Sequence, residues 1–452
     1  MRRVVVAGGG IAALEALAGL RALAGERVEA TLLAPVPSFS YRPLSTAVPF
    51  TFRAERTRDL AELVAGLGAR FIRDGLAHVD EGRSRILTQK GDFLPYDALV
   101  VAVGARTRRV AAAADTWARG AEGRSLFMEL LRGLEGGIIR SVAFVVPRGA
   151  AWAVDAYELA FVATVAARGY PRPSVLLVTA EEAPLQAFGP AVGDAVSIEL
   201  ERAGIELRTG VEQRDPKAID ADRALFLPVV DGPAVAGLPY DGRGFIPVDG
   251  NARVVGVRHC FAAGDATTLQ LKHSALSASQ ATAAAEAIAA DAGADVTPTP
   301  WSPLLHGLLT IPPHFPGASG SAWLDDGEPV THCLWWPPGH VAGRFLAPHL
   351  PASDRGVRPG LGWHPNGLPV AVEVGDGAGG ATATPPAPLS DEAIRRDVTT
   401  RQLTAIRRAE REGVQLEHEL QRRGDEFEHR ERETVAQLEA AGYLRQVQES
   451  ER

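Results

Sequence analysis

The sequence contains little cysteine and no long apolar run. Its 452 residues include only two cysteines, Cys260 and Cys333, too few for a disulfide framework or for a structural zinc site made of thiolates. No apolar stretch approaches the ~20 residues of a membrane-spanning helix, and the first expected strand begins too early for a signal peptide to precede it. These absences lead us to expect a cytoplasmic protein with reduced thiols.

An excess of basic charge is also missing. The formal net charge is −8, whereas a nucleic-acid-binding protein presents a basic surface, so we expect no nucleic-acid partner. Hydrophobic residues make up 46% of the chain and charged residues 23%, which is ordinary globular usage, and the length suits two or three domains. Lysine is rare, with Lys90, Lys217 and Lys272 standing among 47 basic residues, so a lysine inside a motif is informative.

The first feature that is present is a glycine turn near the N-terminus. The run Val4–Val6 leads to Gly8, Gly9 and Gly10, and an Ala/Leu-rich helix follows that contains Ala13. In this GxGxxA pattern Gly8 permits a tight turn, Gly10 lets the backbone approach a pyrophosphate, and Ala13 allows close helix–strand packing. The helix N-terminus supplies amide donors for the phosphates. The pattern predicts a dinucleotide-binding turn.

The acidic residue that usually binds the ribose of such a dinucleotide is missing. The second strand, expected at residues 28–33, ends in Ala34 and Pro35, and Glu29 lies inside the strand. Loss of one charged hydrogen-bond acceptor costs roughly 1.5–3 kcal/mol of binding free energy. We therefore expect weaker retention of the dinucleotide than an acid at this position would give.

Two distant segments support the dinucleotide prediction. Residues 96–105 read as a buried strand through Ala102 that closes on Gly104, and residues 260–267 read as a strand that ends in Gly264 and Asp265. With the glycine turn, these motifs make the chain resemble the pyridine nucleotide–disulfide oxidoreductase superfamily of FAD enzymes. The resemblance covers roughly residues 3–350 and is greatest to the branch of sulfide:quinone oxidoreductases and type II NADH dehydrogenases.

The resemblance implies FAD as the cofactor and assigns roles to further residues. By resemblance, the Asp265 carboxylate bonds the ribityl and phosphate region of the flavin. Arg42 and Pro43, in the segment Phe39–Leu44, would lie beside the flavin, and the backbone at Ala77 would meet the adenine.

Lys272 follows Asp265 by seven residues, where relatives often carry a lysine. A cation near the N1–O2 edge would stabilise the reduced anionic flavin. The neighbouring His273 either caps a helix or relays a proton. No residue qualifies as a catalytic acid or base, and we expect no metal site.

The middle of the chain repeats the strand–turn–helix plan without its glycines. The strand at residues 141–146 is followed by Pro147, Arg148, Gly149 and Trp152, where a pyrophosphate needs small residues. We therefore expect NADH and NADPH to be poor donors. Sulfide oxidation in the family uses cysteines at the flavin face, and this region has none; Cys260 is expected to be a small core residue.

The order of motifs predicts an α/β fold with two Rossmann-like dinucleotide-binding domains, the first interrupted by the second. We expect an FAD-binding domain at 1–110 and 243–297, an inserted degenerate NAD(P)-like domain at 111–242, a C-terminal interface region at 298–374, a linker at 375–388 and a charged helical tail at 389–452. The aromatic segment 334–346 either packs between domains or contacts the inner face of a membrane peripherally. The tail, a solvated helix or weak coiled coil, either self-associates or binds a partner protein.

Three functions remain open at this point. We favour an FAD-dependent oxidoreductase that takes electrons from a small-molecule donor and passes them to a quinone or similar acceptor. The first alternative is a degenerate flavoprotein that acts as a scaffold or sensor through its tail. The second alternative is an NAD(P)H dehydrogenase.

Overall fold

The computed structural model divides into two units, Met1–Pro388 and Leu389–Arg452. The residues that it describes are 1–40, 57–112, 114–118, 120–166, 172–302, 304–310, 323–325, 328–330, 343–350, 367–373, 393, 395 and 398. Arg42, Pro43, Cys333, the linker and nearly all of the tail lie outside them, as does most of the aromatic segment 334–346. Among the described residues, no helix is both long enough and apolar enough to cross a membrane.

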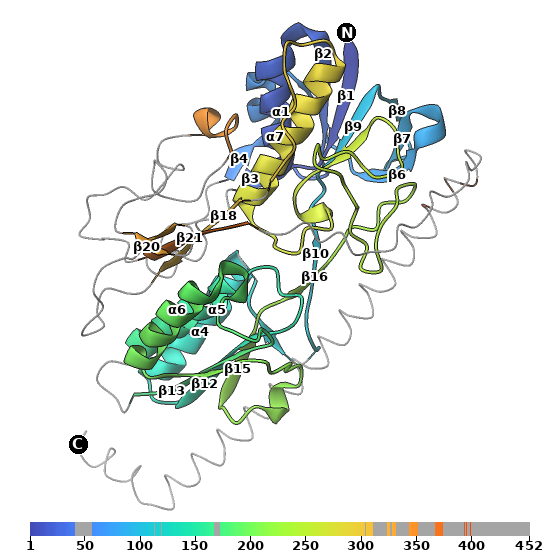
Figure 1. Cartoon of the computed structure of the whole chain (residues 1–452). Coiled ribbons are helices and arrows are strands. Elements are labelled where there is room, and N and C mark those ends of the chain that lie inside the picture. The colour runs from blue at the N-terminus through green and yellow to red at the C-terminus, as the bar shows by residue number, and fades with distance from the viewer. Residues whose placement is uncertain are drawn as a thin grey trace, which may run out of the picture. The chain divides into compact units, whose positions relative to one another are not determined.

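The first sheet has five parallel strands in the order β17-β9-β1-β2-β5. Figure 1 labels three of them, β9, β1 and β2. They are β1 (Arg2–Ala7), β2 (Val28–Leu33), β5 (Arg70–Ile72), β9 (Ala98–Val101) and β17 (Cys260–Ala262). The central strands are apolar and buried, as a parallel sheet covered on both faces requires. Their carboxyl ends bring the three motifs, far apart in sequence, to one edge.

Two long helices of small residues lie side by side against this sheet (Figure 1). They are α1 (Ile11–Ala24) and α7 (Ser274–Asp291). A Cβ atom at Gly19 would lie 2.9 Å from the Cβ of Ala285, so the two helices approach too closely there for a larger residue. The same region contains α3 (Leu60–Gly66), the pair β3 (Ser38–Ser40) and β4 (Thr57–Asp59), and the antiparallel meander β6 (Leu76–Asp80), β7 (Arg85–Thr88) and β8 (Phe93–Pro95).

The second sheet is also parallel, in the order β11-β15-β12-β13-β14. Its strands are β11 (Asp115–Thr116), β12 (Ser141–Val146), β13 (Ser174–Thr179), β14 (Ile205–Arg208) and β15 (Arg223–Phe226), with helices α4 (Ala121–Glu135), α5 (Val154–Ala166) and α6 (Pro190–Ala203). Trp117, Phe127 and Phe144 pack edge to face in its core.

The antiparallel ribbon of β10 (Arg106–Arg108) and β16 (Val229–Asp231) connects the two sheets along the sequence. The chain thus leaves the first sheet, builds the second and returns, which confirms the predicted α/β fold.

The C-terminal part of the first unit contributes a small mixed sheet. Its order is β18-β21-β19-β20, with β18 (Leu304–Thr310), β19 (Trp323–Asp325), β20 (Glu328–Val330) and β21 (Gly367–Glu373). A short 3-10 turn, Ala347–His349, follows in the described segment 343–350. No motif in the sequence predicted this sheet.

The sequence also predicts strands over 245–249 and 259–265 and a helix over 152–168, and the structure differs from all three. The segment 245–249 forms only isolated bridges, Ile246 with Thr267 and Val248 with Val254, because Pro247 has no N–H to give to a ladder. The strand expected over 259–265 is confined to β17, because Gly264–Ala266 turns as a 3-10 helix. The helix expected from Trp152 begins at Val154, since the turn after β12 continues through Ala153.

Candidate functional site

The glycine turn joins β1 to α1 at the carboxyl edge of the first sheet. Gly8 has φ +134°, and a Cβ atom there would lie 2.1 Å from the carbonyl oxygen of Ala102, so only glycine fits. Gly10 caps α1 with extended backbone, and a Cβ atom on it would meet nothing within 4 Å. Ala13 is fully buried. The open space at Gly10, beside the first amides of α1, is what a pyrophosphate requires.

The end of the second strand lies directly against this turn. A Cβ atom on Gly9 would lie 3.1 Å from both the Ala34 Cβ and the Leu60 Cδ1 atoms. Ala34 is buried, and its backbone N–H donates to the carbonyl of Ile72 at 3.1 Å. The position that usually carries the ribose-binding acid is therefore apolar and packed.

The second motif closes the strand next to the glycine turn. The Ala102 N–H donates to the Ala7 carbonyl at 2.8 Å, which fixes β9 beside β1. Gly104 has φ +75° and open space around its Cα atom. Val103, between them, is 37% exposed although the strand before it is buried. An apolar side chain is thus exposed at the end of this strand.

The third motif meets the first one through Gly264. It has φ +77°, and a Cβ atom there would lie 3.1 Å from the Ala12 Cβ atom. The Gly264 N–H donates to Oε1 of Gln280 at 2.8 Å. Asp265 is half-buried and accepts a hydrogen bond from the Ser277 hydroxyl at 3.2 Å. The three motifs therefore converge at one edge of the sheet, with a carboxylate held in place beside the glycines.

Ala77 lies in an irregularity of the meander. The register between β6 and β7 shifts between Leu76, opposite Thr88, and His78, opposite Leu87, so that Ala77 is the extra residue of a bulge. A bulge leaves one residue without a ladder partner. Ala77 is half-buried and lies at this break in the ladder.

Lys272 is buried and its ammonium group is held by the surrounding loop. Its Nζ donates to the carbonyl of Thr267 at 2.7 Å and to that of Leu269, and lies 3.9 Å from the centroid of the Phe245 ring. Burial lowers the pKa of Lys272 to about 8. His273 caps α7, since its Nδ1 accepts from the Ala275 N–H at 3.3 Å. The charge of Lys272 is therefore fixed in place by protein groups.

At the second sheet, the turn after the first strand is filled by the protein's own side chains. The Trp152 ring is 8% exposed, stacks on His273 with centroids 4.4 Å apart, and meets Phe188 edge to face at 5.5 Å. The backbone N–H of Lys272 donates to the Ala151 carbonyl at 3.2 Å. The bulky Trp152 ring thus occupies the position that the small Ala13 has in the first turn.

A carboxylate that we did not expect holds part of the C-terminal region. Glu15 in α1 is fully buried and accepts hydrogen bonds from the Thr282 hydroxyl at 2.8 Å and from the N–H groups of Phe345 at 2.9 Å and Leu346 at 2.7 Å. Burial raises its pKa, and these bonds oppose that rise. The available signal was the one acid of an Ala/Leu-rich helix whose other charged residue is Arg21. Its role is to dock the segment 343–350 on α1 and α7.

A second unexpected carboxylate follows β13. Glu181 stands two residues beyond the strand, where dinucleotide-binding folds carry the ribose acid. It is bonded inward, to the Thr179 hydroxyl at 3.3 Å and to the Gln186 backbone N–H, and burial raises its pKa to about 7. The sequence signal for Glu181 was the run Thr179–Glu182, which begins at the last residue of an apolar strand.

The described residues hold no group of three His, Cys, Asp or Glu side chains that could bind a metal ion. Cys260 is 1% exposed, with its Sγ atom 3.4 Å from the Tyr96 hydroxyl. Its predicted place in the core is confirmed.

Comparisons with known proteins agree with this architecture. Residues 2–287 match the family model described as pyridine nucleotide-disulphide oxidoreductase. The sulfide:quinone oxidoreductase of the hyperthermophilic bacterium Aquifex aeolicus is a similar solved structure, at 20% identity and a TM-score of 0.59, with 69% of this chain and 81% of that chain covered. A ferredoxin reductase of Rhodopseudomonas palustris is 19% identical at a TM-score of 0.51, covering 69% and 83%.

A further similar structure is putidaredoxin reductase in its covalent complex with putidaredoxin, at 18% identity and a TM-score of 0.52, covering 69% of this chain and 79% of that one. No curated protein matches the sequence significantly. The structural likenesses show the fold, while the family match covers more than half of the chain. The glycine turn, with its open cradle at Gly10, fits the family's cofactor. The chain belongs to the pyridine nucleotide-disulphide oxidoreductase family and is an FAD-dependent oxidoreductase.

Proposed function

We propose that this protein transfers electrons from a small-molecule donor, which is neither NADH nor NADPH, to a quinone or a similar acceptor. One observation carries the proposal: the dinucleotide turn of the first sheet is open, whereas that of the second is filled by Trp152. A chain with one usable dinucleotide site holds its flavin there and exchanges electrons directly with small molecules.

Bound FAD supplies the two-electron chemistry, and the residues of this chain hold and orient it. Gly8, Gly9, Gly10 and Ala13 form the pyrophosphate cradle, with Ala102 and Gly104 closing its side. Gly264 and Asp265, whose carboxylate is held by Ser277, would bind the ribityl chain, and the bulged backbone of Ala77 would bind the adenine. Arg42 and Pro43, outside the described residues, complete the proposed set.

Lys272 contributes a fixed charge in this arrangement. Because its ammonium group already donates to two carbonyls and lies on the Phe245 ring, it acts through space. A buried positive charge stabilises a neighbouring anion more strongly than an exposed one. Its proposed role is to favour the reduced anionic form of the flavin.

The exclusion of NAD(P)H has an energetic basis. To enter at the second turn, a dinucleotide would have to displace the Trp152 ring from His273 and Phe188. Removing a buried tryptophan from its packing costs about 3–5 kcal/mol. Pro147 and Arg148 would still occupy the positions of the small residues. This cost opposes binding before any contact with the nucleotide is gained.

We propose a quinone as the acceptor because the fold resembles that of the sulfide:quinone oxidoreductase of Aquifex aeolicus. This likeness extends over 81% of that chain. Among the described residues, no cysteine thiol lies beside the glycine turn. We therefore leave the electron donor unassigned, and sulfide is one candidate to be tried.

The experiment is anaerobic stopped-flow spectroscopy on the purified FAD-loaded protein. Oxidised protein is mixed with NADH, NADPH or sulfide, and photoreduced protein is mixed with a short-chain ubiquinone. We expect both nucleotides to leave the flavin oxidised and the quinone to reoxidise it faster than buffer does. Rapid bleaching by a nucleotide would make the protein an NAD(P)H dehydrogenase.

A second candidate function is a flavoprotein scaffold or sensor, and the apolar Ala34 position together with the filled second turn favours it. In this case the tail, residues 389–452, would bind itself or a partner. The same experiment separates the two functions, because a scaffold would react slowly with every donor and with the quinone.

A further inference from the structure

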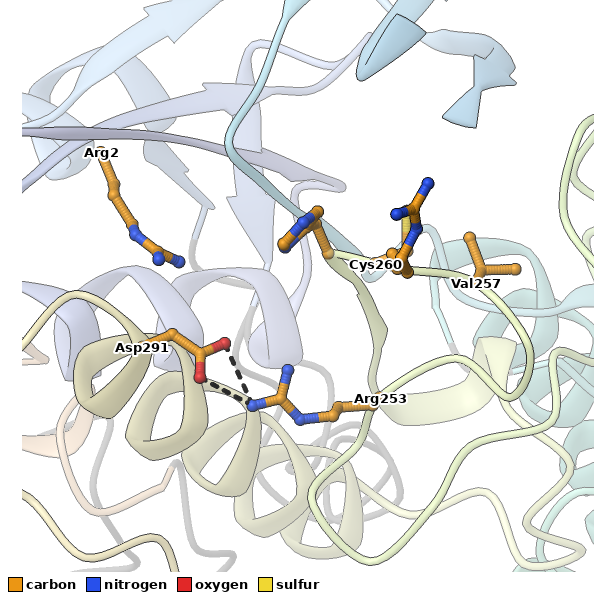
Figure 2. A pocket seen from close by; sticks show the side chains of 7 residues that line it. Arg2, Arg253, Val257, Cys260 and Asp291 are labelled. Atoms are coloured by element: carbon orange, nitrogen blue, oxygen red, sulfur yellow. Dashed lines mark hydrogen bonds and ion pairs between the residues drawn. The ribbon is translucent and has the colours of Figure 1, made fainter. Parts of the chain in front are cut away.

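A depression of about 440 Å³ opens at the amino edge of the first sheet, opposite to the glycine turn (Figure 2). Arg2 begins β1, Cys260 begins β17 and Asp291 ends α7. The remaining lining residues are Arg253, Val257, Arg258 and His259. Because β1 rises roughly 3.3 Å per residue, its length separates this depression from the FAD cradle by about 20 Å.

The lining carries positive charge in excess of negative charge. Three arginines face one carboxylate, that of Asp291. Arg258 is paired with Glu81 at 3.5 Å, and Asp97 is an acidic neighbour of Arg2 without forming an ion pair with it in the described part of the chain. Arg2 therefore supplies the positive charge that is left to attract an anion to the depression.

Arg253 is fixed in a conformation that suits an anionic ligand. Its Nη2 lies 3.0 Å from each carboxylate oxygen of Asp291, and its guanidinium lies 4.8 Å from the centroid of the Phe261 ring. Figure 2 shows Arg2 and Arg253 extending toward the same space beside Asp291. A guanidinium that is already ordered loses little entropy when it bonds a phosphate.

We propose that this depression binds a phosphorylated small molecule through Arg2 and Arg253. Guanidinium groups match phosphate oxygens in geometry and remain charged at every physiological pH. The volume falls within the usual ~300–1,000 Å³ of small-molecule sites, so the ligand extends beyond its phosphate group. Asp291 is placed to accept a hydrogen bond from a ligand hydroxyl, and the buried Cys260 and Val257 supply an apolar floor.

The test is isothermal titration calorimetry of the FAD-saturated protein with ADP and with inorganic diphosphate at low salt. We expect both probes to bind without releasing flavin, and Arg2→Gln to raise the dissociation constant about tenfold. Arg253→Lys keeps the charge and loses the planar fork, so a several-fold weakening is expected from it. Arg132→Gln, on the exposed surface of α4, is the matched control and should bind as the unaltered protein does.

Two results would overturn the proposal. One is the absence of binding heat with either probe at about 1 mM, where a free energy near −4 kcal/mol would still be detected. The other is an equal weakening by Arg132→Gln and Arg2→Gln, which would show diffuse attraction to an arginine-rich surface. An unchanged flavin absorbance spectrum verifies that each variant is folded, and Arg253→Lys carries the test if Arg2→Gln does not fold.

Discussion

At the first sheet the chain turns through Gly8, Gly9 and Gly10, and at the corresponding point of the second sheet it turns through Pro147 and Trp152. The two sheets also differ in the residues that follow the next strand, which is β2 in the first sheet and β13 in the second. At the first sheet that strand is followed by Ala34 and Pro35, and at the second by Ala180 and Glu181. The first sheet therefore keeps the glycines without a following acid, and the second has an acid just beyond its strand without the glycines.

The difference shows which half of the pattern is harder to replace. A pyrophosphate needs empty space beside the helix amides, and no neighbouring side chain can supply space. A ribose needs hydrogen-bond acceptors, which backbone groups or other side chains can supply at a cost of roughly 1.5–3 kcal/mol. Glu181, which lacks the accompanying glycines, accepts a hydrogen bond from the Thr179 hydroxyl instead.

The largest expected effect comes from filling the cradle of the first sheet. Gly10→Val should abolish FAD binding, lowering affinity about hundredfold or more, because its side chain would occupy the space for the pyrophosphate. The protein should still fold, since a Cβ atom there meets nothing within 4 Å and the poorer helix cap costs only ~1 kcal/mol. The measurement is the flavin-to-protein absorbance ratio after gel filtration.

Gly66→Val at the exposed end of α3 is the control for Gly10→Val, because its Cβ position is equally open. It should retain flavin fully. A Gly10→Val protein that stays yellow would place the pyrophosphate elsewhere.

The next effect comes from emptying the turn of the second sheet. Trp152→Ala should lower the free energy of unfolding by about 3 kcal/mol, since it removes a buried ring from contact with His273 and Phe188. Flavin reduction by NADH should remain slow because Pro147 and Arg148 stay in place. Urea denaturation and anaerobic stopped-flow mixing measure the two results.

Trp301→Ala is the matched control for this change, since Trp301 is only partly buried and should lose less stability. Fast reduction of Trp152→Ala by NADH would mean that this one ring closes the second site.

A smaller, pH-dependent effect is expected at Glu181. Its pKa is raised from 4.5 to about 7 in the folded protein because the carboxyl group is buried. The folded state therefore binds this proton more tightly than the unfolded state, and stability falls as the pH rises from about 4.5 to 7. Glu181→Gln should match the unaltered protein near pH 4.5 and exceed its stability near pH 8 by on the order of 2 kcal/mol.

Thermal unfolding measured across this pH range tests the Glu181 prediction. Glu182→Gln, at the exposed neighbouring position, should show no such pH dependence. A Glu181→Gln variant that is destabilised at pH 8 would show that the charged carboxylate is needed, for example by the Gln186 N–H.

Local patterns gave the secondary structure and the convergence of the motifs. The bounds of β2, α6 and α7 follow from apolar runs that begin and end at small, charged or proline residues. The three glycine motifs lie at strand ends, and such ends meet at one edge of a parallel sheet. Periodicity does not specify which distant side chain fills a turn. Trp152 on His273, and Glu15 bonded to Phe345 330 residues away, depend on the packing of whole elements.

The smallest change concerns the carboxylate beside the cradle. Asp265→Ala should lower FAD affinity by roughly tenfold, less than Gly10→Val, because it removes one charged hydrogen-bond partner and leaves the space for the pyrophosphate intact. Ser277, which donates to Asp265 at 3.2 Å, is buried and would lose its acceptor in this variant. Asp249→Ala is the comparison, since it removes a carboxylate that accepts the N–H groups of Asn251 and Arg253 in a turn away from the cradle, and it should retain flavin. Flavin release followed by fluorescence during dilution measures the affinities. Equal retention by Asp265→Ala and Asp249→Ala would remove Asp265 from the site and leave the glycine turn to hold the cofactor alone.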